Sequence, residues 1–260
     1  MKKRDLCWKP KASSDCHTSQ AIQSVQPFPE SGLLADNSHL PLALLAKRLR
    51  RVRDRAYSYI VSSVKLDRST LSFVQHGSAP NFQGDVLTLC TCKHQMRSSQ
   101  TADEWQKDVW IAAFTSRTIH EGRHWLFYLA RIESAHESHS DLWNSVGPDS
   151  REAKAAHNHY LGDMFKPKKP QPSGSARHSP SRYYTPRIHS HRRNRSDTGW
   201  YKDINYRHAR SHRRPPLLVA DPELTFLWDE PMIFLDRDHC RDFFKWSSMQ
   251  EMIAHLREAT

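Results

Sequence analysis

The sequence contains no apolar run of the length that crosses a membrane, about 18 to 20 residues. Basic side chains stand near its start, but no apolar segment follows them, so we expect neither a signal peptide nor a membrane span. Only 37% of the residues are hydrophobic and the mean hydropathy is −0.77, which predicts that part of the chain stays outside any core. Five cysteines, an odd number without a secretory signal, favour reduced thiols and an intracellular protein, cytoplasmic or nuclear.

Several well-marked catalytic motifs are also missing. The chain has no glycine-rich phosphate loop, no dinucleotide-binding glycine motif, no His-Glu-x-x-His helix and no Gly-x-Ser-x-Gly turn. Enzymes built on these motifs are therefore disfavoured, and we expect no cofactor. Cys90, Cys92 and His94 alternate as on one face of a strand, but a fourth ligand and the usual zinc-site spacing are missing, so no metal is expected either.

Cys92 has two interpretations. It is a small buried apolar residue, or it is a nucleophile whose pKa is lowered by Lys93 or His94. Three histidines could act as its base: His120, His124 and His136. The chain has 17 histidines, so a pairing of this kind arises easily by chance, and the structural interpretation is favoured.

The prominent feature that is present is a concentration of positive charge. Between residues 166 and 214 there are 14 Lys and Arg against Asp197 and Asp203, whereas the whole chain carries a net +11. Aromatic side chains are interspersed among these charges, at Tyr183, Tyr184, Trp200, Tyr201 and Tyr206. The combination predicts a surface that contacts phosphates and stacks on bases, and its candidate phosphate contacts include Arg192, Arg193 and Arg195. The alternative is a solvated loop whose charge only keeps the chain soluble.

Hydrophobic periodicity predicts an α+β fold, a mostly antiparallel sheet or small barrel with peripheral helices. Strands are expected at 57–64, 86–92, 109–114, 125–132, 217–220 and 232–235. Helices are expected at 41–53, capped by Asn37 or Ser38, and at 247–256, and a short helix or turn at 138–146. The predicted organisation is a flexible leader over 1–38, the first part of the domain over 39–165, a disordered basic insertion over 166–214, and the rest of the same domain over 215–260.

Five pieces of sequence carry a family resemblance. They are the Gly-Ser-Ala-Pro-Asn loop at 77–81 with Gly84, the Leu-Thr-Leu-Cys-Thr-Cys-Lys run at 87–93 with Met96 and Arg97, the strand at 108–111, the strand at 126–132 with Leu142 and Trp143, and the segments 162–165 and 217–226. Together they resemble the second of the nucleotide-modification-associated domain families, found in phage and bacterial gene neighbourhoods linked to altered nucleobases. The resemblance spans roughly 57–235. Lys107, His94 and Phe165 depart from the family pattern.

The resemblance, and a weaker one to barrels of the PUA and EVE type, implies a pocket that takes a nucleobase. It places Asn81, Asp85, Lys93, Arg97 and Asp163 around the mouth of that pocket, together with Cys92. Asn81 would pair with a base edge, while Lys93 and Arg97 would hold phosphate. Turn or cap chemistry for Asn81 and Asp163, and surface ion pairs for Lys93 and Arg97, are the structural alternatives.

The predicted function is therefore that of a nucleic-acid-associated protein linked to nucleobase modification. A pocket binds a base or nucleotide, and the basic stretch binds the phosphate backbone of DNA or RNA. Two alternatives remain open: an enzyme acting on a nucleotide or nucleobase through Asp85, Cys92 or Asp163, and a degenerate family member without catalysis. The sequence leaves the oligomeric state undetermined.

Overall fold

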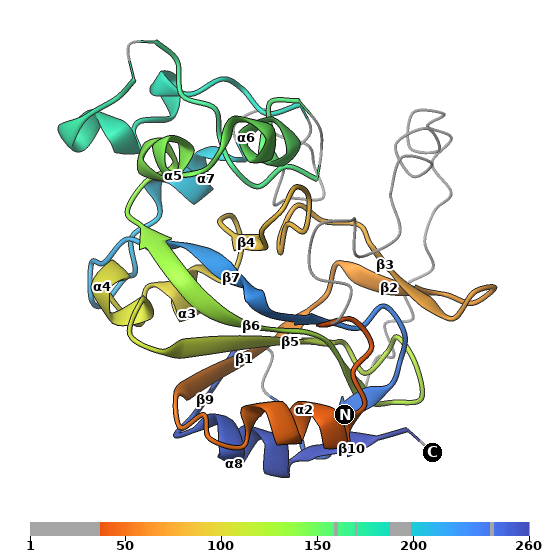
Figure 1. Cartoon of the computed structure of the whole chain (residues 1–260). Helices are drawn as coiled ribbons and strands as arrows, with labels where there is room; N and C mark the ends of the chain where they lie inside the picture. The colour runs from red at the N-terminus through yellow and green to blue at the C-terminus, as the bar shows by residue number, and fades with distance from the viewer. Residues whose placement is uncertain (1–36, 159–160, 170, 188–198, 240–241, 260) are drawn as a thin grey trace, which may run out of the picture.

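The computed structural model of the chain describes residues 37–158, 161–169, 171–187, 199–239 and 242–259. Almost all of the predicted leader over 1–38, and Arg192, Arg193 and Arg195, lie outside these residues. The fold is α+β, as predicted, with few and short helices around one large sheet (Figure 1).

The sheet is mixed and curled like half a barrel. Its strands are β1 (Arg55–Val61), β4 (Thr88–Leu89), β5 (Val109–Thr115), β6 (His124–His136), β7 (Leu217–Leu227), β8 (Ile233–Leu235), β9 (Phe244–Trp246) and β10 (Leu256–Glu258). They follow the order β10-β8-β6-β5-β1-β9, and β7 pairs with both β6 and β4. β1 runs parallel to β5, whereas the other paired strands of this sheet run antiparallel, so the sheet is mixed. A separate hairpin joins β2 (Val64–Asp67) to β3 (Ser72–Gln75).

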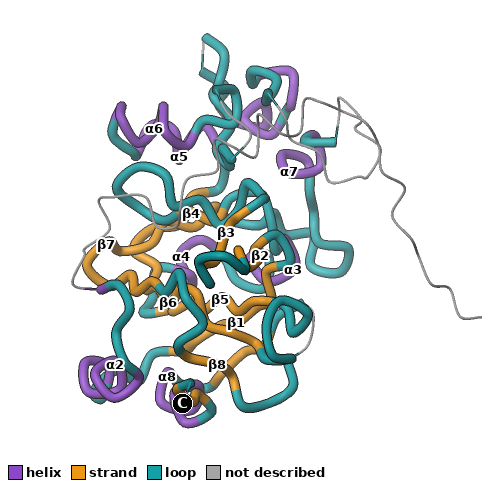
Figure 2. Tube along the Cα trace, turned by 90° about the vertical axis from the view of Figure 1, so that its right-hand side faces the viewer, coloured by secondary structure: helices purple, strands orange, loops and turns teal. Residues whose placement is uncertain are grey.

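Two helices close one side of the sheet. α2 (Leu42–Leu49) and α8 (Met249–Ala254) lie together at the bottom of Figures 1 and 2, and their apolar faces pack on the sheet. The Ser248 hydroxyl caps α8 by accepting from the Glu251 N–H at 3.2 Å. The cap predicted for α2 is wrong, because α2 begins after Pro41 and the Asn37 side chain instead donates to the Glu223 carbonyl at 2.9 Å.

The opposite end of the molecule contains the remaining helices. α3 (His94–Arg97) and α4 (Ala102–Trp105) adjoin the sheet, and above them lie α5 (His139–Ser145), α6 (Pro148–Lys154), the 3-10 turns η2 (Gly174–His178) and η3 (Pro180–Arg182), and α7 (Tyr201–Asn205). Figures 1 and 2 both show α5, α6 and α7 grouped at the end away from α2 and α8.

The described part of the basic stretch is folded, which corrects the expectation that 166–214 is disordered. Tyr183, Trp200 and Ile204 from this stretch pack with Phe165 and Ala156 in a small hydrophobic cluster of their own. Trp200 is only 3% exposed, and its ring centroid lies 5.2 Å from that of Phe165. The stretch is poor in aliphatic residues, so sequence periodicity gives no sign of a core that aromatic rings supply.

Candidate anion-binding site

Asn81 and Asp163, which we expected to face a base, are interior residues. Asn81 is 2% exposed, and its amide donates to the Leu161 carbonyl at 2.8 Å. Asp163 is fully buried and accepts from the Thr88 hydroxyl at 3.0 Å and from the Cys90 N–H at 3.1 Å. Their predicted contact with nucleic acid is therefore corrected to a structural role, in which they hold the loop before β4 against the segment around residue 163.

Lys154, at the end of α6, supplies the cation of this buried network, and no sequence pattern singled it out. Its ammonium donates to the Asn81 backbone carbonyl at 3.2 Å and to the Asn81 side-chain oxygen at 3.3 Å. Burial lowers the pKa of Lys154 to about 8, against the attraction of Asp163. Burial likewise raises the pKa of Asp163, while Lys154 and the bonds from Thr88 and Cys90 oppose that rise. Asp85 lies at the edge of the network, exposed, and accepts a hydrogen bond from the Ser150 hydroxyl.

Arg97 and Lys93 do not form the predicted phosphate clamp. Arg97 is fully buried, and its guanidinium donates to the Cys92 carbonyl at 2.7 Å and to the Pro216 carbonyl at 2.8 Å. It therefore fastens the short α3 segment to the start of β7. Lys93 has a left-handed backbone with φ of 54°, and its ammonium lies 5.3 Å from the centroid of the Tyr59 ring and 3.3 Å from the Asp242 carbonyl oxygen.

Cys92 is not equipped as a nucleophile. Burial raises its pKa to about 12, and the positive charges of Arg97 and Lys93 offset only part of this rise. The thiol is therefore protonated at neutral pH, and its sulfur lies 3.8 Å from the Ala79 carbonyl oxygen. In the part of the chain that the structure describes, no group of three or more His, Cys, Asp and Glu could hold a metal ion.

His94 instead connects the folded body to the basic stretch. Its ring stacks on Tyr206 with centroids 4.6 Å apart and planes 14° apart. Its Nε2 lies 3.0 Å from a carboxylate oxygen of Asp203, which is buried in α7. Tyr206 and the buried Tyr183 and Trp200 are thus occupied within the protein, which corrects their expected role in base stacking. Tyr184 and Tyr201 remain 40% exposed.

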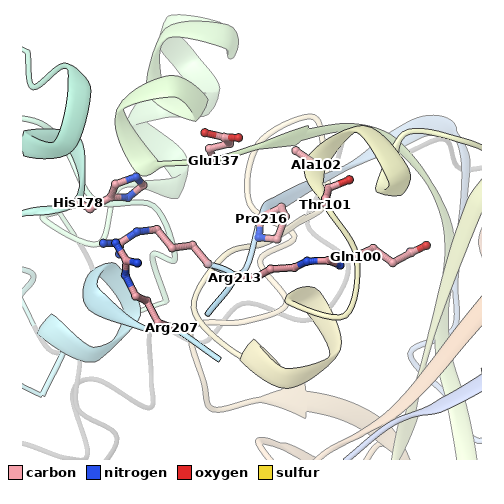
Figure 3. Close-up of a pocket in the computed structure, with 9 residues that line it drawn as sticks. Gln100, Thr101, Ala102, Glu137, His178, Arg207, Arg213 and Pro216 are labelled. Carbon is pink, nitrogen blue, oxygen red and sulfur yellow. The ribbon is translucent and has the colours of Figure 1, made fainter. Parts of the chain in front are cut away.

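A pocket of about 290 Å³ opens where the basic stretch meets the body. Arg207, Arg213, Arg214 and His178 line one side of it. Its other lining residues come from the body: Gln100, Thr101, Ala102, Glu137 and Pro216. Figure 3 shows Arg207 pointing toward His178 on one side of the pocket, with Gln100, Thr101 and Ala102 on the other side.

The cations of this pocket exceed its anions. Burial lowers the pKa of Arg214, and so does repulsion from Arg207 and Arg177. Burial also lowers the pKa of His178 to about 4, and Arg214 and Arg177 add to this effect. The Glu137 carboxylate pairs with Arg177, and Glu104 lies 3.9 Å from Arg213. Mutual repulsion of this kind marks a place that favours an anion.

Gln100, one of the lining residues, has a buried amide beside the pocket. Gln100 is 4% exposed, and neither its side-chain oxygen nor its side-chain nitrogen has a hydrogen-bond partner among the described residues. An unsatisfied buried polar group costs about 1 to 3 kcal/mol, so such groups are rare without a reason.

Comparison with known proteins adds no family to these observations: no protein-family model, no curated protein and no solved structure matches the chain. The resemblance to the nucleotide-modification-associated domain family accordingly stays a prediction from the sequence. Within the described residues, no helix is both long enough and apolar enough to span a membrane.

The sequence pointed to the right stretch but not to the right residues. Arg207, Arg213 and Arg214 belong to the basic run, yet nothing in their spacing distinguishes them from the other arginines. Gln100 and His178 carried no signal, because they meet these arginines only through the tertiary fold.

Proposed function

We propose that this chain binds nucleic acid through the folded part of its basic stretch. The observation that supports this most directly is the charge left over at the pocket: among the described residues, Arg207 and Arg214 have no carboxylate within ion-pair distance. Of the 14 Lys and Arg between residues 166 and 214, all but Arg192, Arg193 and Arg195 belong to the described residues. Phosphates are the natural counter-ions of such a surface.

Two exposed rings support the same proposal. Tyr201 is 40% exposed and lies at the start of α7, with its centroid 4.8 Å from that of Trp200 in an edge-on contact. Tyr184 is also 40% exposed. Because base stacking on exposed aromatic side chains tolerates any sequence, we expect binding to single strands with little sequence preference.

The enzyme alternative has less support. Cys92 is protonated at neutral pH, and Asp163 is buried among hydrogen bonds that it makes within the protein. The link to nucleobase modification and the kinship with PUA-like barrels remain part of this proposal on the strength of the sequence motifs, and the half-barrel curl of the sheet is compatible with that kinship.

Fluorescence anisotropy with single- and double-stranded DNA and RNA, repeated over a series of salt concentrations, tests the proposal. If three arginines of the pocket region contact phosphates, log K should fall against log[salt] with a slope of at least about −2 on single strands and about −3 on duplexes. Binding that is absent at low salt, or a flat plot, would refute it.

A further inference from the structure

Among the residues that the structure describes, the charges of Arg207 and Arg214 at the pocket have no acidic partner to neutralise them. Arg214 donates to the Ile204 carbonyl at 3.1 Å, which fixes the guanidinium but leaves its charge uncompensated. The nearby carboxylates of Glu137 and Asp141 both form ion pairs with Arg177. The pocket thus offers roughly two positive charges to whatever enters it.

The volume limits what can enter. A pocket of about 290 Å³ is at the lower end of small-molecule sites, which measure about 300 to 1,000 Å³. It has room for one phosphate group with part of the sugar or base attached to it. A continuous stretch of strand would have to lie across it.

We propose that this pocket binds a phosphate monoester, with Arg207 and Arg214 on the phosphate oxygens. The monoester is either the phosphorylated end of a nucleic-acid strand or a free nucleotide. This inference rests on the proposed function and names the chemical group that this pocket recognises.

The charge count favours a monoester over an internal phosphodiester. A monoester carries about 1.5 to 2 negative charges at pH 7 and three free oxygens, whereas an internal phosphate carries one charge. Two guanidiniums match the monoester in charge and in number of donors.

Oligonucleotides that differ only at their ends test this inference. A 12-nucleotide single strand, in DNA and in RNA, carries an internal fluorophore and ends in hydroxyls, in a 5′-phosphate or in a 3′-phosphate, and a circular form of the same sequence has no end. Titration calorimetry with nucleoside monophosphates, against the corresponding nucleosides, tests the free nucleotide as a source. We expect one phosphorylated end, or the monophosphates, to bind at least about tenfold more tightly than the hydroxyl counterpart, because hydrogen bonds to charged groups contribute about 1.5 to 3 kcal/mol each.

One variant and one control assign the effect to the pocket. Arg207→Ala/Arg214→Ala should abolish the preference for the phosphate. Arg51→Ala/Arg68→Ala removes two exposed arginines elsewhere and should leave the preference intact.

The outcomes separate this inference from the proposed function. If circular, hydroxyl-ended and phosphorylated strands bind equally and no monophosphate binds, the monoester pocket is wrong while nucleic-acid binding stands. If monophosphates bind and strands do not, the pocket is right and nucleic-acid binding fails. A preference that survives Arg207→Ala/Arg214→Ala overturns the assignment to this pocket, and binding of neither class overturns both proposals.

Discussion

The buried pair of Lys154 and Asp163 gives the sharpest stability prediction. Both side chains are fully buried, and each one's charge opposes the pKa shift that burial causes in the other. Asp163→Asn keeps the shape of the side chain but removes the anion. The variant leaves the Lys154 ammonium in the interior without a counter-charge. The new asparagine amide can also place its N–H₂ donor against the Cys90 N–H donor, where no hydrogen bond can form. Breaking a buried pair on one side costs about 3 to 5 kcal/mol, and we expect a loss of that size in the free energy of unfolding.

Lys154→Met is the complementary change. It removes the ammonium and its bonds to Asn81, and leaves Asp163 buried with its bonds from Thr88 and Cys90. We expect a loss of about 3 kcal/mol. The double variant contains neither charge, so it should lose less than the sum of the single variants, with a coupling of about 2 kcal/mol.

Urea unfolding followed by tryptophan fluorescence measures the free energy of unfolding of the parent, the two single variants and the double variant. Variants at two exposed positions, Arg51→Ala and Arg68→Ala, provide a cycle in which the effects should add. If the Lys154 and Asp163 effects also add within about 0.5 kcal/mol, or if Asp163→Asn is as stable as the parent, then the two charges do not depend on each other and the reasoning is refuted.

Three further predictions follow from the described contacts. The pKa of Lys154 is about 8 in the folded protein, against 10.5 for an ordinary lysine, so between these pH values the unfolded chain binds one more proton than the folded chain. The free energy of unfolding should therefore rise by up to about 3 kcal/mol from pH 8 to pH 10.5, relative to that of Lys154→Met. A constant difference in unfolding free energy between the parent and Lys154→Met over that range would contradict this. Burial lowers the pKa of His178 to about 4, and repulsion from Arg214, Arg177 and Arg207 adds to this effect, while Asp141 opposes it. This pKa should rise in Arg214→Ala, which NMR titration of the imidazole would measure. An unchanged titration midpoint would show that Arg214 does not act on His178. Trp200→Ala changes no charge but should destabilise the packing of the basic stretch by about 3 to 5 kcal/mol. The arginines of the stretch should then be cleaved more readily by trypsin, and the affinity for nucleic acid should fall. An unchanged affinity would indicate that the stretch acts only through its charge.

The strongest sheet elements could be predicted from the sequence, because their side chains record burial locally. The apolar runs at 109–114 and 125–132 became β5 and β6, which are central in the sheet and buried along most of their length. Their pairing could not be predicted. The parallel contact of β1 with β5 joins segments separated by a hairpin, the short strand β4 and two helices, and no local pattern records such a contact.

The run at 86–92 shows why apolar composition alone was insufficient. Only Thr88–Leu89 form a strand there, since the Cys90 N–H bonds to the Asp163 carboxylate and not to a neighbouring strand. The same contact explains why the prediction for Asp163 was wrong. An aspartate in a glycine-containing loop is expected to be exposed, but Asp163 is buried because it bonds to the Cys90 N–H, 73 positions away.

The positive charge of the candidate site could be predicted from the sequence, but its geometry could not. Fourteen basic residues in one stretch identify a polyanion surface, but which of them form a pocket depends on aromatic packing that fixes the stretch and on contacts such as that of His94 with Tyr206.

If arginines held in the pocket contact phosphates, the salt dependence of binding should change in Arg207→Ala/Arg214→Ala. Log K against log[salt] should be measured on one duplex for the parent, for this variant and for Arg51→Ala/Arg68→Ala. We expect the pocket variant to lose about 1.8 units of slope and the control, with the same change in net charge, to keep the parent slope. Equal slopes for the two variants would contradict this, because net charge alone would then account for the binding.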